Sequence, residues 1–174
     1  MRSFLRDALL KGKATIAPPT PDAAALGEVA RALAERARRR LGRSLSIREV
    51  DAGSCNGCEL EIHAVNNPIY DIERFGLKFV ASPRHADVLL VTGPVTWNMR
   101  EALLRTYSAT PEPKWVVGVG DCALNCGVFA GSRAVVGPLA AVLPVDLHVA
   151  GCPPQPIDIV RGLLALLEAP AAKA

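Results

Sequence analysis

Four short apolar runs, each ending in glycine, constrain the fold of this chain most strongly. All are of strand length and rich in valine, leucine and isoleucine, and three are apolar on both faces, as buried parallel strands are. Parallel strands need crossover connections that are usually helical, so these runs predict an α/β domain. The runs are LSIREVDAG (45–53), DVLLVTG (87–93), KWVVGVG (114–120) and VDLHVAG (145–151).

Helical patterns alternate with these runs. We expect helices at 57–65, 97–108 and 156–168; in the last of these, Val160, Leu163, Leu164 and Leu167 form one apolar stripe. The alternation predicts a doubly wound, mainly parallel sheet with cysteine-bearing loops at the carboxyl ends of its strands. We expect residues 44–170 to form this single domain.

The first 43 residues differ from the rest. Residues 1–21 form an N-terminal segment with a proline-rich linker, ATIAPPTP, and residues 22–43 form a basic amphipathic helix that Thr20 is placed to cap. Residues 1–13 suit either a short amphipathic helix on a membrane or a disordered terminus.

The basic charge is concentrated in this N-terminal part. Residues 1–43 hold 10 Lys and Arg against 4 Asp and Glu, a net +6, whereas residues 44–174 hold 10 against 13, a net −3. Aromatic residues make up only 5% of the chain and no nucleic-acid motif is present, so we expect no nucleic-acid partner. The helix presents either a solvated face or a surface for an acidic partner or anionic lipid.

No apolar run approaches the roughly 18 residues that a membrane-spanning helix needs. Arg6, Asp7 and Lys11 interrupt any secretory signal at the start, so we expect a cytoplasmic protein. Five cysteines in that compartment are not expected to form a disulfide framework.

Three of the cysteines follow the ends of three different predicted strands. Cys55, Cys122 and Cys152 each lie a few residues past a strand, and Cys58 joins Cys55 in a CxxC turn. Loops at the carboxyl ends of parallel strands converge on one crevice. We therefore expect these four thiols to meet at one point.

Four thiolates fit a [4Fe–4S] cluster, which takes one cysteine per iron. Structural zinc usually draws on two compact cysteine pairs, and a redox dithiol would leave Cys122 and Cys152 unused. Unrelated structural cysteines would not be expected at three strand ends. The segment DCALNCG also offers Cys126, so the choice between Cys122 and Cys126 stays open on these grounds.

Four stretches resemble a known family: SCNGCELEI (54–62), FGLKFVASPRHADVLLVTGPVT (75–96), GDCA (120–123) and LPVDLHVAGCPPQP (143–156). They are similar to the small cluster-bearing subunit shared by energy-converting, membrane-associated [NiFe] hydrogenases, formate hydrogenlyase included, and by respiratory complex I. The resemblance is closest to the formate hydrogenlyase type.

The resemblance implies a flavodoxin-like α/β domain that binds one [4Fe–4S] cluster through Cys55, Cys58, Cys122 and Cys152. The family usually has glycine in place of Cys126, which favours Cys126 as a spectator. Complex I members have two adjacent cysteines where this chain has CxxC, so the spacing points to the hydrogenases.

The function implied is that of an oxidoreductase subunit without a bond-making active site of its own. It would relay electrons between a ferredoxin-like iron–sulfur subunit and the Ni–Fe site of a large subunit, in a complex with membrane subunits. The chain would then lie at the inner face of the cell membrane, held there through its partners. The alternative is a complex I-like subunit that passes electrons to quinone.

Several other polar residues are candidates for a functional or a purely structural role. Glu59 and Glu61 are good helix-start residues or proton relays. His63, His85 and His148 are not expected to be ligands. Either Arg84 and Asp87 pair locally, or the loop 92–96 forms one wall of the cluster pocket.

Overall fold

The computed structural model describes residues 23–168 of the 174-residue chain. The expectations for the N-terminal segment, the proline-rich linker and the Thr20 cap lie outside the described residues. Within the described part, no helix is both long and apolar enough to cross a membrane.

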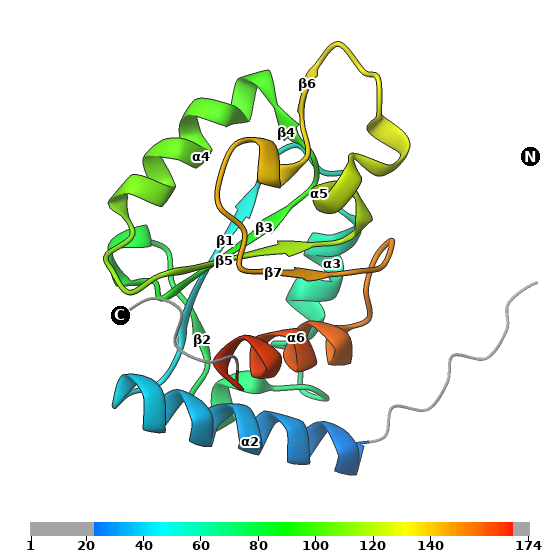
Figure 1. The fold of residues 1–174 in the computed structure, drawn as a ribbon. Helices are drawn as coiled ribbons and strands as arrows, with labels where there is room; N and C mark the ends of the chain where they lie inside the picture. The colour runs from blue at the N-terminus through cyan, green and yellow to red at the C-terminus, as the bar shows by residue number, and fades with distance from the viewer. Residues whose placement is uncertain (1–22, 169–174) are drawn as a thin grey trace, which may run out of the picture.

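A five-stranded parallel sheet forms the centre of the molecule (Figure 1). Each of the four apolar runs contains one of its strands, and the short strand at one edge was not predicted. Numbered within this sheet, the strands follow the order 2-1-3-4-5, which is that of flavodoxin-like folds and confirms the predicted fold class. The strands are β1 (Ser46–Asp51), β2 (Lys78–Phe79), β3 (Val88–Thr92), β5 (Trp115–Val119) and β7 (Leu147–Val149), in the order β2-β1-β3-β5-β7.

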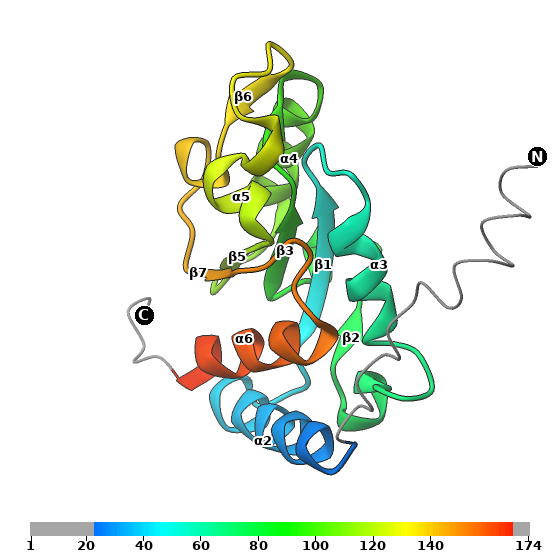
Figure 2. The same ribbon diagram turned by 90° about the vertical axis from the view of Figure 1, so that its right-hand side faces the viewer.

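Helices cover both faces of this sheet (Figure 2). Val88 and Leu90 of β3 belong to the core shared with three helices, whereas Leu89 and Val91 belong to the core on the opposite face. This period-2 alternation makes three layers, helix, sheet and helix. The helices are α2 (Ala23–Leu41), α3 (Gly57–Ala64) and α6 (Pro156–Glu168) on one face, with α4 (Trp97–Ala109) and α5 (Asp121–Asn125) on the other.

The basic helix α2 lies beside α6 at one end of the molecule, as both views show. Its residues Ala30, Leu33 and Ala37 are buried in the same core as Val160 and Leu163 of α6. The apolar stripes predicted for the two helices therefore face each other and the sheet.

Shorter elements connect these layers. They are a two-stranded antiparallel pair, β4 (Val95–Thr96) with β6 (Val135–Gly137), and four 3₁₀ turns: η1 (Ile72–Phe75), η2 (Pro83–His85), η3 (Gly127–Phe129) and η4 (Leu139–Ala141).

The expected local pair of Arg84 with Asp87 is wrong. Asp87 is buried and accepts two hydrogen bonds from the guanidinium of Arg43, at 3.0 and 2.5 Å. It also accepts one from the backbone N–H of Ser46, at 2.9 Å. The carboxylate thus joins the start of β3 to the segment that leads from α2 into β1.

Candidate metal centre

A pocket of about 90 Å³ lies at the carboxyl edge of the sheet, where β5 and β7 point toward α3 and α5 (Figure 1). Loops that follow four of the five strands contribute to its wall. All four predicted ligand cysteines line it, and Cys126 does not. The lining residues are Ser54, Cys55, Gly57, Cys58, Gly93, Asp121, Cys122, Gly151, Cys152 and Pro153.

The loop between β1 and α3 is shaped by its own short polar side chains. Asp51 Oδ1 accepts hydrogen bonds from the backbone N–H groups of Gly53 and Ser54, both at 2.7 Å. Asn56, at φ 69°, adopts the left-handed conformation that asparagine tolerates better than most residues. The chain then enters α3, which places Cys58 in its first turn.

Asp121 holds the Cys122 and Cys152 loops together. Its backbone N–H donates to the carbonyl of Gly151 at 2.9 Å, and its Oδ1 accepts from the N–H of Gly151 at 2.8 Å. The N–H of Gly120 adds a bond to the carbonyl of Val149 at 2.8 Å. Asp121 was not among the residues predicted for the site, and its position next to a predicted ligand was the only signal available.

Two glycines leave room for ligand sulfurs. A Cβ at Gly120, which has φ +86°, would lie 2.5 Å from Sγ of Cys58. A Cβ at Gly127, at φ +46°, would lie 2.8 Å from Sγ of Cys122. Real Cβ atoms do not approach sulfur so closely, so side chains at these positions would displace the thiols.

Burial favours the neutral form of two of the pocket thiols, Cys58 and Cys122. Burial is the main cause that raises the pKa of Cys58 to about 12, with smaller contributions from Glu59 and the other three pocket thiols. Burial also raises the pKa of Cys122. Metal ligation requires thiolates, and burial disfavours the charged thiolate form. Positively charged iron would stabilise that form, so the four thiols suit an iron–sulfur group as donors.

Alkylation of Cys58 in the cluster-free chain should keep accelerating as the pH rises from about 8 to about 10. With a folded pKa near 12, the thiolate fraction rises about tenfold per pH unit in this range. In the urea-unfolded chain the thiol has a pKa of about 8.5, so its rate should level off. Quantitative mass spectrometry of the Cys58 peptide measures both.

The same shift has a defined sign for stability. The folded state holds the Cys58 proton more tightly than the unfolded state. The contribution of this thiol to the free energy of unfolding is therefore fully present below about pH 8.5 and is lost as the pH rises toward 12. A folded-chain alkylation rate that levels off at the same pH as the unfolded-chain rate would contradict the raised pKa.

The loop after β3 forms part of the pocket wall, as expected for residues 92–96. Gly93 lines the pocket. Thr96 Oγ1 donates to the carbonyl of Ala52 at 3.0 Å, which fastens this loop to the one that carries Cys55 and Cys58.

Cys126 caps α5 outside the pocket. It is buried, has φ 68°, and its N–H donates to the carbonyl of Cys122 at 2.9 Å. A left-handed conformation favours glycine, so the cysteine here occupies a backbone position suited to a smaller residue.

The other candidate residues, Glu59 and the three histidines, do not line the pocket. Glu59 is buried in the first turn of α3, and neither of its carboxylate oxygens has a hydrogen-bond partner among the described residues. His63 and His85 are exposed. Burial lowers the pKa of His148, whose Nδ1 is buried without a hydrogen-bond partner in the described part of the chain.

All four predicted ligand cysteines line one pocket. Within residues 23–168, no three cysteine, histidine or carboxylate side chains are grouped as ligands of a single metal ion. A [4Fe–4S] cluster binds each of its four thiolates through a different iron.

Comparisons with known proteins place the chain in a family. The chain is 49% identical over 128 residues to a probable membrane-bound hydrogenase subunit mbhJ of Pyrococcus furiosus, covering 74% of this chain and 77% of that one. It is 44% identical to formate hydrogenlyase subunit 7 of Escherichia coli, covering 75% of this chain but only 52% of that relative. It is also 44% identical to an NADH-quinone oxidoreductase subunit of Heliobacterium modesticaldum, covering 63% of each chain.

A solved structure of a membrane-bound sulfane sulfur reductase, an archaeal respiratory membrane complex, contains a similar chain. The two share 34% identity with a TM-score of 0.65, over 79% of this chain and 74% of that one. The family described as "NADH ubiquinone oxidoreductase, 20 Kd subunit" matches residues 55–166, well over half of the chain. The chain therefore belongs to this family of oxidoreductase-complex subunits.

Proposed function

We propose that this chain is the electron-transfer subunit of a membrane-associated complex of the hydrogenase or formate hydrogenlyase type. In this proposal Cys55, Cys58, Cys122 and Cys152 bind one [4Fe–4S] cluster. The observation that carries it is the convergence of these four cysteines, from loops after three strands, on one pocket.

The chain's own residues position and enclose the site. When bound, a [4Fe–4S] cluster supplies one-electron transfer without making or breaking substrate bonds. Asp121 fixes the spacing of two ligand loops, and Gly120 leaves room for the sulfur of Cys58. Gly93 and Pro153 add uncharged walls to the pocket. No residue of this chain is assigned a bond-making role.

The exposed residues around the pocket are evidence for a large partner subunit that would cover it. Cys55 and Cys152 are exposed. Exposed apolar side chains also lie on α3, which carries Cys58, and on η3, which follows the helix that carries Cys122. Leu60 of α3 is 61% exposed, and Val128 of η3 is 83% exposed. Apolar groups around a redox site suit burial against a partner, here a large subunit with a Ni–Fe site.

The remaining partners follow from the same proposal. A ferredoxin-like iron–sulfur subunit would exchange electrons with the cluster, and membrane subunits would hold the assembly at the cytoplasmic face of the membrane. The CxxC spacing of Cys55 and Cys58 supports the hydrogenase assignment. The names of two relatives, a membrane-bound hydrogenase subunit and a formate hydrogenlyase subunit, agree with it.

A second candidate is a complex I-like subunit that passes electrons to quinone. The 44% identity to an NADH-quinone oxidoreductase subunit supports it. The pocket described above would serve either function, so the partner's acceptor decides between them.

Hydrogen should reduce the cluster of this chain in the anaerobically purified complex. Electron paramagnetic resonance would follow the reduced cluster, and a complex with Cys55→Ser would identify which signal belongs to this chain. A cluster that stays oxidised under hydrogen but is reoxidised by an added quinone after dithionite reduction would favour the second candidate.

A further inference from the structure

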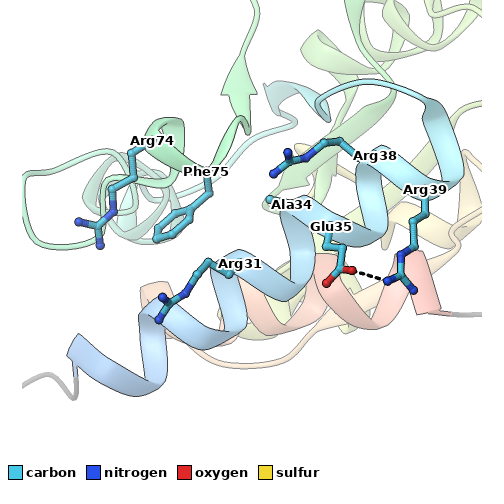
Figure 3. Close-up of a pocket in the computed structure, with 7 residues that line it drawn as sticks. All are labelled: Arg31, Ala34, Glu35, Arg38, Arg39, Arg74 and Phe75. Carbon is cyan, nitrogen blue, oxygen red and sulfur yellow. Dashed lines mark hydrogen bonds and ion pairs between the residues drawn. The ribbon is translucent and has the colours of Figure 1, made fainter.

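A cationic groove lies between α2 and η1, away from the cysteine pocket (Figure 3). We call it the α2–η1 groove; its volume is about 520 Å³. In Figures 1 and 2, α2 lies at one end of the molecule and α5 lies toward the other. The groove is lined by Arg31, Ala34, Glu35, Arg38, Arg39, Arg74 and Phe75.

Most of the positive charge in this groove is not neutralised by the protein. Glu35 is the one carboxylate among the lining residues, and it pairs with Arg39 on the same helix. Arg31 donates to the carbonyl of Gly27, one turn away on α2, at 2.9 Å. Within residues 23–168, neither Arg31, Arg38 nor Arg74 forms an ion pair with a carboxylate. Three guanidinium groups that have no carboxylate partner among the described residues thus border one hollow.

The groove also has an apolar wall. Phe75 is half-buried, and its ring points from η1 toward α2, while Arg38 extends from α2 toward η1 (Figure 3). The guanidinium of Arg74 lies 4.7 Å from the centre of the Phe75 ring, a cation–π contact that holds Arg74 at the edge of the groove. Ala34 adds a second apolar surface beside the ring.

This combination selects a particular ligand chemistry. Guanidinium groups bind phosphate oxygens through paired hydrogen bonds, and like charges around one hollow repel each other until an anion separates them. The hollow is larger than a free phosphate ion needs, and its apolar wall suits carbon attached to the phosphate. A phosphodiester headgroup satisfies both requirements.

We propose that the α2–η1 groove binds the phosphodiester headgroup of an anionic phospholipid. Residues 23–43, which contain α2, hold six arginines against two glutamates, a net +4, and each basic residue near an anionic membrane strengthens binding. Two relatives are named as parts of membrane-bound assemblies. Because the groove lies far from the cysteine pocket, lipid contact leaves that pocket open to a partner, and the proposal does not depend on the cluster.

Binding of the full-length chain to vesicles tests this proposal. Flotation with phosphatidylglycerol vesicles and with phosphatidylcholine vesicles would give the two affinities at low and physiological salt. The groove variant combines Arg31→Gln, Arg38→Gln and Arg74→Gln. The matched control combines Arg84→Gln, Arg100→Gln and Arg133→Gln, which removes the same charge from exposed residues elsewhere.

The chain should prefer phosphatidylglycerol vesicles, and the groove variant should bind them at least tenfold more weakly, while the control stays within twofold of the parent chain. Equal losses in both variants would overturn the proposal, because binding would then follow net charge alone. So would displacement from the vesicles by millimolar inorganic phosphate or by poly-glutamate, which would assign the groove to a free anion or an acidic protein.

Thermal unfolding of each variant checks that the fold is intact. If the triple variant is unstable, Arg38→Glu can be compared with Arg100→Glu, since both side chains are exposed. A charge reversal at Arg38 that leaves vesicle binding unchanged would overturn the proposal in the same way.

Discussion

Serine in place of Cys122 should abolish cluster binding, whereas serine in place of Cys126 should leave it intact. Cys122 lines the pocket with the three other predicted ligands, and Cys126 caps α5 outside it. Loss of one of four thiolates leaves one iron without its protein ligand. Iron content and visible absorption after anaerobic reconstitution should fall severalfold for Cys122→Ser and stay near the parent level for Cys126→Ser.

The two variants are closely matched controls for each other. Cys122 is 8% exposed and Cys126 is 7% exposed, so both substitutions place a hydroxyl in a buried site, one within α5 and the other at its C-terminal end. A general loss of stability would therefore affect both. If Cys126→Ser lost the cluster and Cys122→Ser kept it, the assignment of the fourth ligand would be wrong.

Alanine in place of Gly120 should reduce cluster occupancy to well under half. The added Cβ would lie 2.5 Å from Sγ of Cys58 and 3.4 Å from the carbonyl oxygen of Gly151, so the methyl group competes with a ligand for space. The φ of +86° adds backbone strain of about 1–3 kcal/mol. Iron content of the reconstituted chain measures the loss, and urea unfolding of the cluster-free chain measures the strain.

Gly131→Ala separates the two effects. Gly131 also has a positive φ, +79°, but a Cβ there would meet no atom within 4 Å. This variant should lose some stability and keep its cluster. Equal cluster loss in both variants would show that strain is the cause, and full occupancy in Gly120→Ala would show that the pocket does not hold the cluster as proposed.

The main strands and helices could be predicted because each has a long or continuous pattern. β3 and β5 are fully buried five-residue runs, and α6 carries its apolar stripe over 13 residues. β2 and β4 have two residues each, and α5 has five. These elements are too short for a periodic pattern of apolar residues to be recognised in the sequence. These short elements depend on tertiary contacts and hydrogen bonds from neighbouring segments.

The grouping of the four cysteines was predictable for a topological reason. The carboxyl ends of parallel strands lie at one edge of the sheet. Residues that directly follow these strands therefore lie close together, regardless of the sequences of the loops. The hydrogen bonds that set the loops were not predictable in the same way. Asp121 and Gly151 are 30 residues apart, and Arg43 and Asp87 are 44 apart, with no local pattern linking either pair.

The α2–η1 groove could not be predicted from the sequence for the same reason. The basic charge of α2 is plain in the sequence, but Arg74 and Phe75 belong to a turn more than 30 residues later. Only the packing of η1 against α2 makes one groove from the two segments.

Metal and sulfide analysis of the anaerobically purified full-length chain tests the central claim most directly. Iron, acid-labile sulfide and zinc would be measured per chain on one preparation. We predict about four iron and four sulfide per chain, with zinc far below stoichiometric. About one zinc per chain, with no sulfide even after reconstitution with iron and sulfide, would contradict the proposed cluster.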